Sequence, residues 1–454
     1  MSEIDAVQDT KSDWINRIKM LGPGLLFAGA AIGVSHLVQS TKAGAEYGLA
    51  LLWAVILAHI FKYPFFEFGP RYASATGESL IQGYRKLGNW VLVLFIVMTI
   101  GTMFTVQSAV TIVTAGLATK LFGLTGNAII WVAILLGVCV LILTVGRYSV
   151  LDKTMKAVIV ILTISTLLAL FFAFGKGFHA DVSLAQTFPL EGAGLAFLIA
   201  LMGWLPAPID LSVWHSLWAI EKDKTTKEQF TSKKALFDFN VGYWGTFCLA
   251  LSFLLLGAIV MFGTGEKFSP QGGIFAGQLI TLYTSSLGEG AKMIIGLAAF
   301  TTMFSTTLTC LDALPRTMAA ATAVFQQPSV DPDSPESLDT PMEFDDRTGE
   351  TTAHEFMTVP RKYYWFWMAI LVVGTIVILG TLVSSMGVMV KIATILSFLT
   401  APFFAIFNYR LVTSQHMPEA LRPGKRLRWL SFAGMVFLIG FGLLYLASLA
   451  GLVG

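Results

Sequence analysis

Two segments decide the fold: Gly22-Pro23-Gly24-Leu25-Leu26-Phe27-Ala28-Gly29-Ala30-Ala31-Ile32-Gly33-Val34-Ser35-His36, and Met202-Gly203-Trp204-Leu205-Pro206-Ala207-Pro208-Ile209-Asp210. In the first segment a proline suits the start of a helix, whereas Gly29 and Gly33 weaken the middle of one. In the second, Pro206 and Pro208 remove two backbone donors and block two carbonyls. We therefore expect two apolar helices that are interrupted.

The composition places these segments in a membrane protein. Of the 454 residues, 55% are hydrophobic and 13% are charged, whereas an average soluble domain is about 25% charged. A helix needs about 20 apolar residues to cross a bilayer, because every backbone N–H must be paired inside lipid. We predict an all-α polytopic membrane protein with eleven transmembrane helices, and a short external helix in the region Phe275–Met293. The spans are expected near Pro23–Gly48, Leu49–Tyr72, Trp90–Thr119, Ala128–Val145, Met155–Phe174, Gly192–Ile220, Leu236–Gly263, Met293–Val324, Tyr364–Ser385, Met389–Arg410 and Trp429–Leu452.

The distribution of Lys and Arg gives the orientation. With the N-terminus inside, 23 of these residues lie on the inner side and 5 on the outer side, while Lys62 and Lys391 fall within spans. The positive-inside rule predicts a cytoplasmic N-terminus and an outer C-terminus, in the cell (inner) membrane. Residues 1–20 then form a cytoplasmic segment. The acidic, proline-containing stretch 326–361 is predicted to be a disordered cytoplasmic loop.

The two interrupted segments occupy matching positions, because they begin the first and the sixth spans. Interrupted helices at corresponding places in two halves point to a central binding site in an inverted-repeat transporter. The halves are residues 21–174 (spans one to five) and 192–410 (spans six to ten), and 429–454 is an eleventh span. The alternative is that both segments are kinks used only for close packing.

At these segments the chain resembles the Nramp family of divalent-metal transporters. The first span follows the family's first helix without a gap, through Ala43-Gly44-Ala45-Glu46-Tyr47-Gly48. The second opens with Leu52-Trp53 and closes with Arg71-Tyr72-Ala73-Ser74-Ala75-Thr76-Gly77, and the sixth ends in His215-Ser216. The resemblance implies a LeuT-type arrangement of five plus five inverted spans, with one extra helix.

The residues of the family's metal site are changed in this chain. The family's Asp-Pro-Gly-Asn sequence falls on Gly33-Val34-Ser35-His36, so the metal-binding Asp is a glycine. In the sixth span the family's Met before a Pro-His pair becomes Ala207-Pro208 or Pro208-Ile209, depending on the register. The acids of the family's proton path fall on Gln107 and Val110. The loss of these acids argues against the family's proton route.

The changes have a consistent chemical direction. A thioether favours soft transition metals, so its loss argues against the usual Mn or Fe selectivity. Magnesium prefers oxygen ligands and keeps much of its water, so a roomier site around Gly33 and Ala207 can admit a hydrated ion. Nramp-related magnesium transporters also lack the Met, and the chain resembles them there.

Polar residues within the membrane are the next candidates. Asp210 can replace the missing acid from the opposite helix, or it can cap the helix after the break. His36 is either a ligand and proton acceptor or a hydrogen-bonded structural residue. His215 can serve a proton path or pack between helices, and Gln107 is expected to hydrogen-bond across helices. Lys62 is expected to snorkel toward a helix end.

Two acid–base pairs lie toward the cytoplasmic side. Glu67 and Arg71 are four residues apart on the second span, and Asp312 and Arg316 have the same spacing on the eighth. This spacing places both partners on one helix face, so each pair is expected to form a salt bridge. The pairs are either a gate that opens during alternating access or static structural contacts.

The leading hypothesis is a secondary transporter that moves a divalent metal cation (Mg, Mn or similar) by alternating access. The carbonyls of Gly33 and Ala207, together with Ser35, His36 and Asp210, are expected near the ion. The alternative is a transporter of a small organic solute on the same scaffold, over which Trp204 can close. An oxygen-lined cavity favours the first hypothesis and an apolar one the second.

Other function classes find no support in the sequence. An enzyme is not expected, because the chain contains no His-Glu-x-x-His, Gly-x-Ser-x-Gly or P-loop motif. A formal charge of +2 does not suggest nucleic-acid binding. We expect no cofactor and no obligate protein partner beyond the lipid bilayer and the transported ion.

Overall fold

The computed structural model describes residues 21–145, 148–178, 182–225, 231–288, 290, 292–327, 344–345, 350–351, 360–382 and 385–452. The predicted segment 1–20 and most of the predicted disordered loop 326–361 lie outside these residues. Inside that loop, two short strands, β1 (Phe344–Asp345) and β2 (Glu350–Thr351), pair in an antiparallel register.

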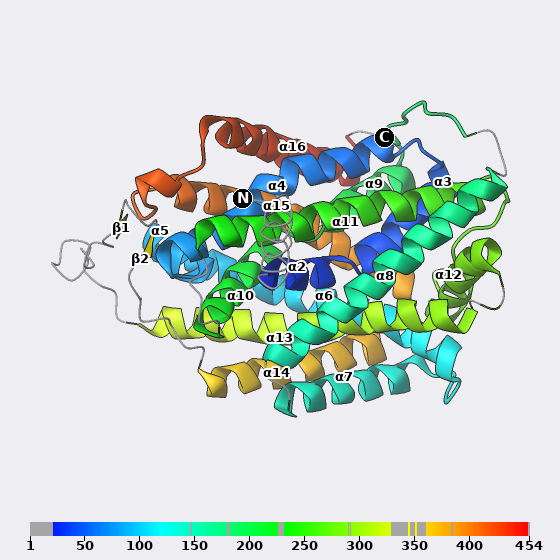
Figure 1. Cartoon of the computed structure of the whole chain (residues 1–454), viewed down its shortest axis with the longest axis horizontal. Coiled ribbons are helices and arrows are strands. Elements are labelled where there is room, and N and C mark those ends of the chain that lie inside the picture. Colours follow the sequence, from blue (N-terminus) through cyan, green and yellow to red (C-terminus); the bar gives the residue numbers. More distant parts are fainter. Residues whose placement is uncertain are drawn as a thin grey trace, which may run out of the picture.

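The described residues form a bundle of long helices that run side by side (Figure 1). Each predicted apolar segment contains helix. The helices are α2 (Pro23–Ala31), η1 (Val34–Ser40), α3 (Thr41–Tyr47), α4 (Leu52–Thr76), α5 (Leu80–Leu87), α6 (Asn89–Phe122), α7 (Ala128–Val145), α8 (Tyr148–Lys176), α9 (Gly192–Trp204), α10 (Leu211–Thr225), α11 (Ser232–Val260), α12 (Gly272–Leu287), α13 (Lys292–Gln326), α14 (Arg361–Val377), η3 (Ile378–Leu382), α15 (Met386–Thr413), η4 (Glu419–Leu421) and α16 (Lys425–Leu449).

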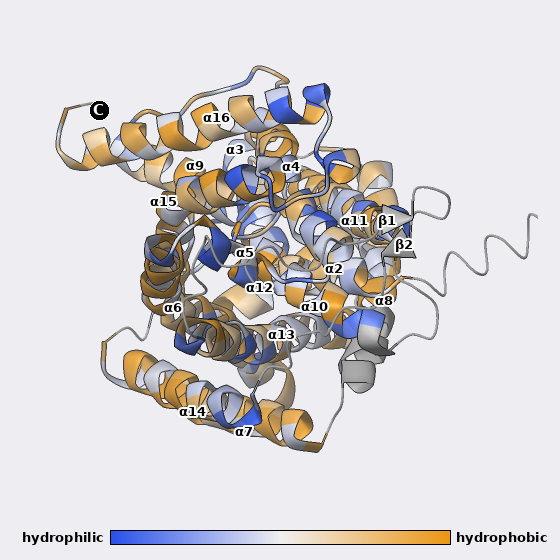
Figure 2. Ribbon diagram, turned by 90° about the vertical axis from the view of Figure 1, so that its left-hand side faces the viewer, coloured by the Kyte–Doolittle hydropathy of each residue, from blue (hydrophilic) through white to orange (hydrophobic). Residues whose placement is uncertain are grey.

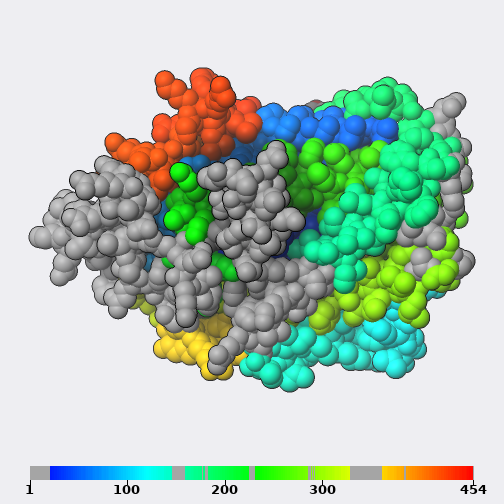
Figure 3. Space-filling model, in the orientation of Figure 1, coloured from blue at the N-terminus to red at the C-terminus, as the bar shows by residue number. Residues whose placement is uncertain are grey.

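The outer helices present apolar side chains to the surroundings. Figure 2 shows α7, α14 and α16 on the outside of the bundle, with apolar residues along their length. Large exposed hydrophobic side chains include Phe171 on α8 and Leu443 on α16. In the space-filling view, α16, α8 and α7 make up much of the surface (Figure 3). An apolar surface of this extent requires lipid around it.

Eight of the described helical runs are long and apolar enough to cross a membrane, and two further apolar helices are shorter. The number of eleven crossings therefore stays a prediction. Several boundaries differ from the expected ones. The second span begins at Leu52 and not Leu49, because Gly48 ends α3 with a positive φ of 57°. The helix of the fifth predicted span, α8, starts at Tyr148 and not at Met155.

The structure contains two short helices outside the predicted spans: α5, which the sequence analysis did not predict, and α12, which it did. Helix α5 lies between the second and third spans, and its start carries a capping box in which the Ser79 and Gln82 side chains each bond the other's backbone. The Ser-x-x-Gln sequence is the signal that predicts such a start. Helix α12 confirms the short helix expected in the region Phe275–Met293.

Both predicted interruptions are confirmed. The first span consists of α2, η1 and α3, and between α2 and η1 Ile32 and Gly33 leave helical geometry. The sixth span consists of α9 and α10, separated by residues 205–210 with two prolines and extended backbone at Leu205. Each break exposes carbonyl groups at the end of one half-helix and N–H groups at the start of the next.

Helix α11 fixes the first half-helix in place. The Asp238 carboxylate accepts hydrogen bonds from the backbone N–H groups of Gly22 (2.9 Å) and Gly24 (2.7 Å), so it caps the N-terminus of α2. The helices approach so closely that a Cβ at Gly24 would lie 2.0 Å from the carbonyl oxygen of Asp238. Only glycine fits this contact.

This contact gives a stability prediction. Gly24→Ala forces α2 away from α11, and we expect it to destabilise the protein by about 1–3 kcal/mol or more. The matched control is Gly101→Ala on α6, where a Cβ meets nothing within 4 Å. There the better helix propensity of alanine should stabilise by about 0.5–1 kcal/mol. Thermal unfolding of both variants in detergent measures the difference, and equal effects would contradict the close-packing argument.

Candidate functional site

A small cavity of about 30 Å³ lies between the two breaks and the helices α6 and α13. Most of its lining is aliphatic or aromatic, from residues such as Val34, Val106 and Trp204. The polar side chains at its wall are those of Ser35, Thr306 and Cys310. A space of this size holds about one water molecule. The cavity therefore does not gather oxygen atoms around a point.

Lys62 occupies the break in the sixth span. Its ammonium group donates hydrogen bonds to the carbonyl oxygens of Met202 (2.6 Å), Gly203 (2.8 Å) and Ala207 (3.2 Å), and its side chain is 0% exposed. The expectation that Lys62 snorkels to a helix end is thus wrong. A lysine in the middle of α4 reaches the free carbonyls at the end of α9, where the negative end of a half-helix favours a cation.

The position of Lys62 changes the role of the Ala207 carbonyl. The sequence suggested that this oxygen faces a metal ion, whereas in the structure it accepts a hydrogen bond from the lysine. Three donors on one ammonium match three acceptors. The carbonyls that the broken helix frees are therefore already satisfied by a cation that belongs to the chain.

Asp210 lies on the other side of the same break, directly before α10. It is only 6% exposed, and its Oδ1 atom has no hydrogen-bond partner among the described residues. Its carboxylate interacts electrostatically with Lys62. The N–H groups of Leu211 and Ser212 donate to the carbonyl oxygens of Pro208 and Ile209, so the first turn of α10 is closed by the backbone.

Ser35 and His36 follow the break in the first span, but only Ser35 lines the cavity. The Ser35 hydroxyl lies 2.7 Å from Nδ1 of His36, and Nε2 of His36 lies 3.0 Å from the carbonyl oxygen of Thr246 on α11. Because a carbonyl can only accept, Nε2 carries a proton, while the Ser35 hydroxyl donates to the Ala31 carbonyl oxygen at 2.6 Å and lies beside Nδ1. The structure therefore gives His36 two internal partners and points it toward α11.

The expected space beside Gly33 is filled. A Cβ at Gly33 would lie 2.8 Å from the Thr306 side chain, so a threonine from α13 occupies the place where the sequence suggested room for a hydrated ion. The Gly33 carbonyl accepts hydrogen bonds from the backbone N–H groups of His36 and Leu37. Both observations correct the expectation of an open site at this residue.

The remaining candidates on the helices around the cavity are placed as follows. Trp204 lines the cavity and donates from Nε1 to the Ser397 hydroxyl at 2.8 Å. Gln107 donates across helices to the Thr307 carbonyl at 3.4 Å, as expected, and does not line the cavity. His215 is buried and stacks on Phe27 with ring centroids 5.7 Å apart, and neither of its ring nitrogens has a hydrogen-bond partner among the described residues.

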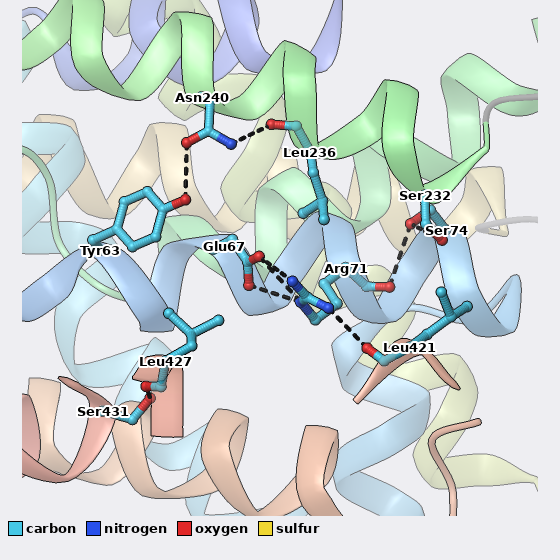
Figure 4. Close-up of polar contacts among 10 residues, drawn as sticks. All are labelled: Tyr63, Glu67, Arg71, Ser74, Ser232, Leu236, Asn240, Leu421, Leu427 and Ser431. Atoms are coloured by element: carbon cyan, nitrogen blue, oxygen red, sulfur yellow. Dashed lines mark hydrogen bonds and ion pairs between the residues drawn. The ribbon is translucent and has the colours of Figure 1, made fainter. Parts of the chain in front are cut away.

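The two predicted acid–base pairs are confirmed, and both are tied to neighbouring elements. Arg71 donates to both oxygens of Glu67, and also to the Leu421 carbonyl of η4 at 2.8 Å (Figure 4). Arg316 lies 2.8 Å from Asp312, whose carboxylate also accepts from the Tyr364 hydroxyl on α14 at 2.9 Å. These links connect α4 and α13 to other parts of the bundle, at the end predicted to be cytoplasmic.

A family model described as natural resistance-associated macrophage protein-like (Nramp) matches residues 24–448. This chain belongs to the Nramp family. An uncharacterised protein of Pasteurella multocida is 35% identical over 448 residues, which are 98% of this chain and 95% of that relative. The resemblance seen in the sequence is therefore confirmed at the level of the family.

Solved structures show the Nramp fold directly. A crystal structure of a mutant of the Eremococcus coleocola manganese transporter aligns with a TM-score of 0.69 over 96% of this chain and 87% of that one, at 15% identity. A closed, bromovinylhydantoin-bound structure of MHP1, a nucleobase-cation-symport-1 family transporter, aligns with a TM-score of 0.57 at 11% identity, over 94% and 92% of the two chains. The chain thus has the LeuT-type fold of Nramp proteins.

Family membership settles the broad class of function. Nramp proteins are membrane transporters, so this chain is an integral membrane protein of a transporter family and not of an enzyme family. The division into repeats 21–174 and 192–410 and the assignment of individual site residues stay predictions. Lys62 and Thr306 are the residues at the site that the sequence reasoning missed.

Proposed function

We propose that this Nramp protein is a secondary transporter that moves a divalent metal cation by alternating access, between the two interrupted helices. The observation that carries the proposal is the buried carboxylate of Asp210, whose Oδ1 atom has no hydrogen-bond partner among the described residues. A buried carboxylate oxygen requires a positive or hydrogen-bonding partner. The nearby Lys62 ammonium group balances part of this charge, and a hard divalent cation can supply the partner that Oδ1 lacks, since carboxylate oxygen is its preferred ligand.

The donor set argues for a hard, hydrated ion. Within the described residues no group of three or more His, Cys, Asp or Glu side chains is placed to hold a metal. Such a poor ligand set does not dehydrate an ion, and magnesium keeps several of its waters when bound. The Eremococcus coleocola protein, which shares the fold, is named a manganese transporter, and this supports a divalent cation as the cargo. The cavity of about 30 Å³ must widen for such an ion to enter.

Transport of a small organic solute is the second candidate, and the lining of the cavity favours it. The wall is mostly apolar, and Trp204 forms part of it. Small-molecule sites are typically apolar with a few placed polar groups. MHP1, which shares the fold, was solved with bromovinylhydantoin bound. In both cases we propose that the protein lies in the cell (inner) membrane. Its N-terminus is on the cytoplasmic side, and the cargo crosses the bilayer through the protein.

Uptake into proteoliposomes tests the proposal. We expect saturable uptake of magnesium, and weaker uptake of manganese or calcium, into vesicles that contain the full chain and not into empty vesicles. Asp210→Ala should lower this uptake about tenfold or more, the equivalent of 1.4 kcal/mol or more in binding. If folded protein takes up none of the three metals, the metal proposal fails and organic solutes become the cargo to screen.

A further inference from the structure

A second and larger cavity, of about 300 Å³, lies at the end of the bundle predicted to face outward. It is bounded by residues of η1, α3, α9 and α15, and by the segment that leads into α12. Helices α3 and α12 lie at the same end of the molecule (Figure 1). The cavity is separate from the small central one, since the two share no lining residue.

Three helices begin at this cavity. It is lined by Ala193 in the first turn of α9, by Phe275 in the first turn of α12 and by Gly387 in the first turn of α15. The N-terminus of a helix carries a partial positive charge, because its first N–H groups point outward without an intrahelical partner. The Gly387 N–H at the start of α15 already donates to the Pro270 carbonyl at 3.1 Å, so the helix ends alone do not make a site.

Two lysines add formal charge to the same wall. Lys391, in the second turn of α15, is exposed toward the cavity and has no ion-pair partner among the described residues. Lys42 lies 3.6 Å from Glu46 and over the Phe197 ring at 5.3 Å, so its charge is partly balanced. None of the described residues that line the cavity is acidic. The charge that remains for a ligand is that of Lys391.

Gln39 supplies an independent indication of a ligand. Its side chain lines the cavity and is only 4% exposed, yet its amide makes no hydrogen bond with any of the described residues. The amide atoms themselves are reached from the cavity, so a ligand or water there can pair with them. Its NH₂ group can donate to the same anion that Lys391 attracts.

We infer that this cavity binds a small organic carboxylate. The carboxylate group pairs with Lys391 and accepts a hydrogen bond from Gln39, and the apolar part of the ligand lies against Phe197 and Phe268. The site therefore goes beyond the proposed function, and it does not depend on which cargo passes the central cavity.

Binding of benzoate to the purified full chain tests this inference, with benzamide as an uncharged ligand of the same shape. We expect saturable binding of benzoate by calorimetry, and binding of benzamide that is weaker by about tenfold or more, because benzamide lacks the negative charge that pairs with Lys391. Lys391→Met should weaken benzoate binding to the same extent, and Lys391→Arg should largely preserve it. Lys120→Met, at an exposed lysine on α6, is the control.

Two results would overturn the inference. The first is benzoate binding no tighter than benzamide binding. The second is benzoate binding that is unchanged in the Lys391→Met variant. Both are measured without transport, so they are independent of the metal-uptake experiment. Thermal unfolding in detergent shows whether each variant is folded. If the Lys391→Met variant does not fold, the comparison of benzoate with benzamide on the Lys391→Arg variant still tests the inference.

Discussion

Lys62→Met is expected to abolish transport and to destabilise the protein by about 3–5 kcal/mol, the usual cost of removing one member of a buried charged cluster. The methionine side chain fills the space of the lysine stem but leaves the carbonyls of Met202, Gly203 and Ala207 without a donor. It also leaves the nearby Asp210 carboxylate without its cation. The break in the sixth span should then lose its shape.

Thermal unfolding in detergent and uptake into proteoliposomes measure the two effects. Lys120→Met, at an exposed position on α6, is the matched control. It should change the stability by no more than about 0.5 kcal/mol and leave the uptake unchanged. Lys62→Arg keeps the charge but not the compact three-donor geometry, so it should retain more stability than Lys62→Met. A Lys62→Met variant as stable and active as the unchanged chain would show that the three hydrogen bonds contribute nothing.

Asp210→Asn is expected to lower uptake about tenfold or more while changing the stability by less than about 1 kcal/mol, since asparagine caps a helix as well as aspartate does. The substitution removes the negative charge beside the break and leaves a side chain of nearly the same shape that can still accept a hydrogen bond. Asp210→Ala removes both, so it should add a loss of about 0.5–2 kcal/mol of stability to the loss of uptake.

The pair of substitutions separates the two interpretations of this residue. If Asp210 binds the cargo, the asparagine variant is stable and inactive. If Asp210 serves only as a helix cap, the asparagine variant transports like the unchanged chain and the alanine variant alone is impaired. Uptake and thermal unfolding should be measured on the same preparations, so that a loss of activity is not confused with a loss of folded protein.

The architecture could be predicted from the sequence because the signals for it are local. Gly29 and Gly33 weaken the middle of a helix, and the Pro206-Ala207-Pro208 run removes helical hydrogen bonds. Their matching positions in two halves, together with the recurrence of apolar runs, led to the interrupted helices that the structure contains. Salt bridges four residues apart on one helix, such as Glu67–Arg71, are local in the same sense.

The composition of the site could not be predicted, because it depends on contacts between distant parts of the chain. Lys62 reaches carbonyls 140 to 145 positions away, and nothing next to it in the sequence indicates that target. Gly33 suggested empty space, yet Thr306, from a helix more than 270 positions later, fills it. A missing side chain shows where room is created but not which neighbour takes it.

The Lys62 ammonium group also bears on the energy source for transport. A dissolved ion drives transport by leaving one compartment and entering the other, so that its gradient does work. A cation that is covalently attached to the chain cannot be released on either side. No sodium or metal gradient can therefore act through the carbonyls of Met202, Gly203 and Ala207 while Lys62 holds them.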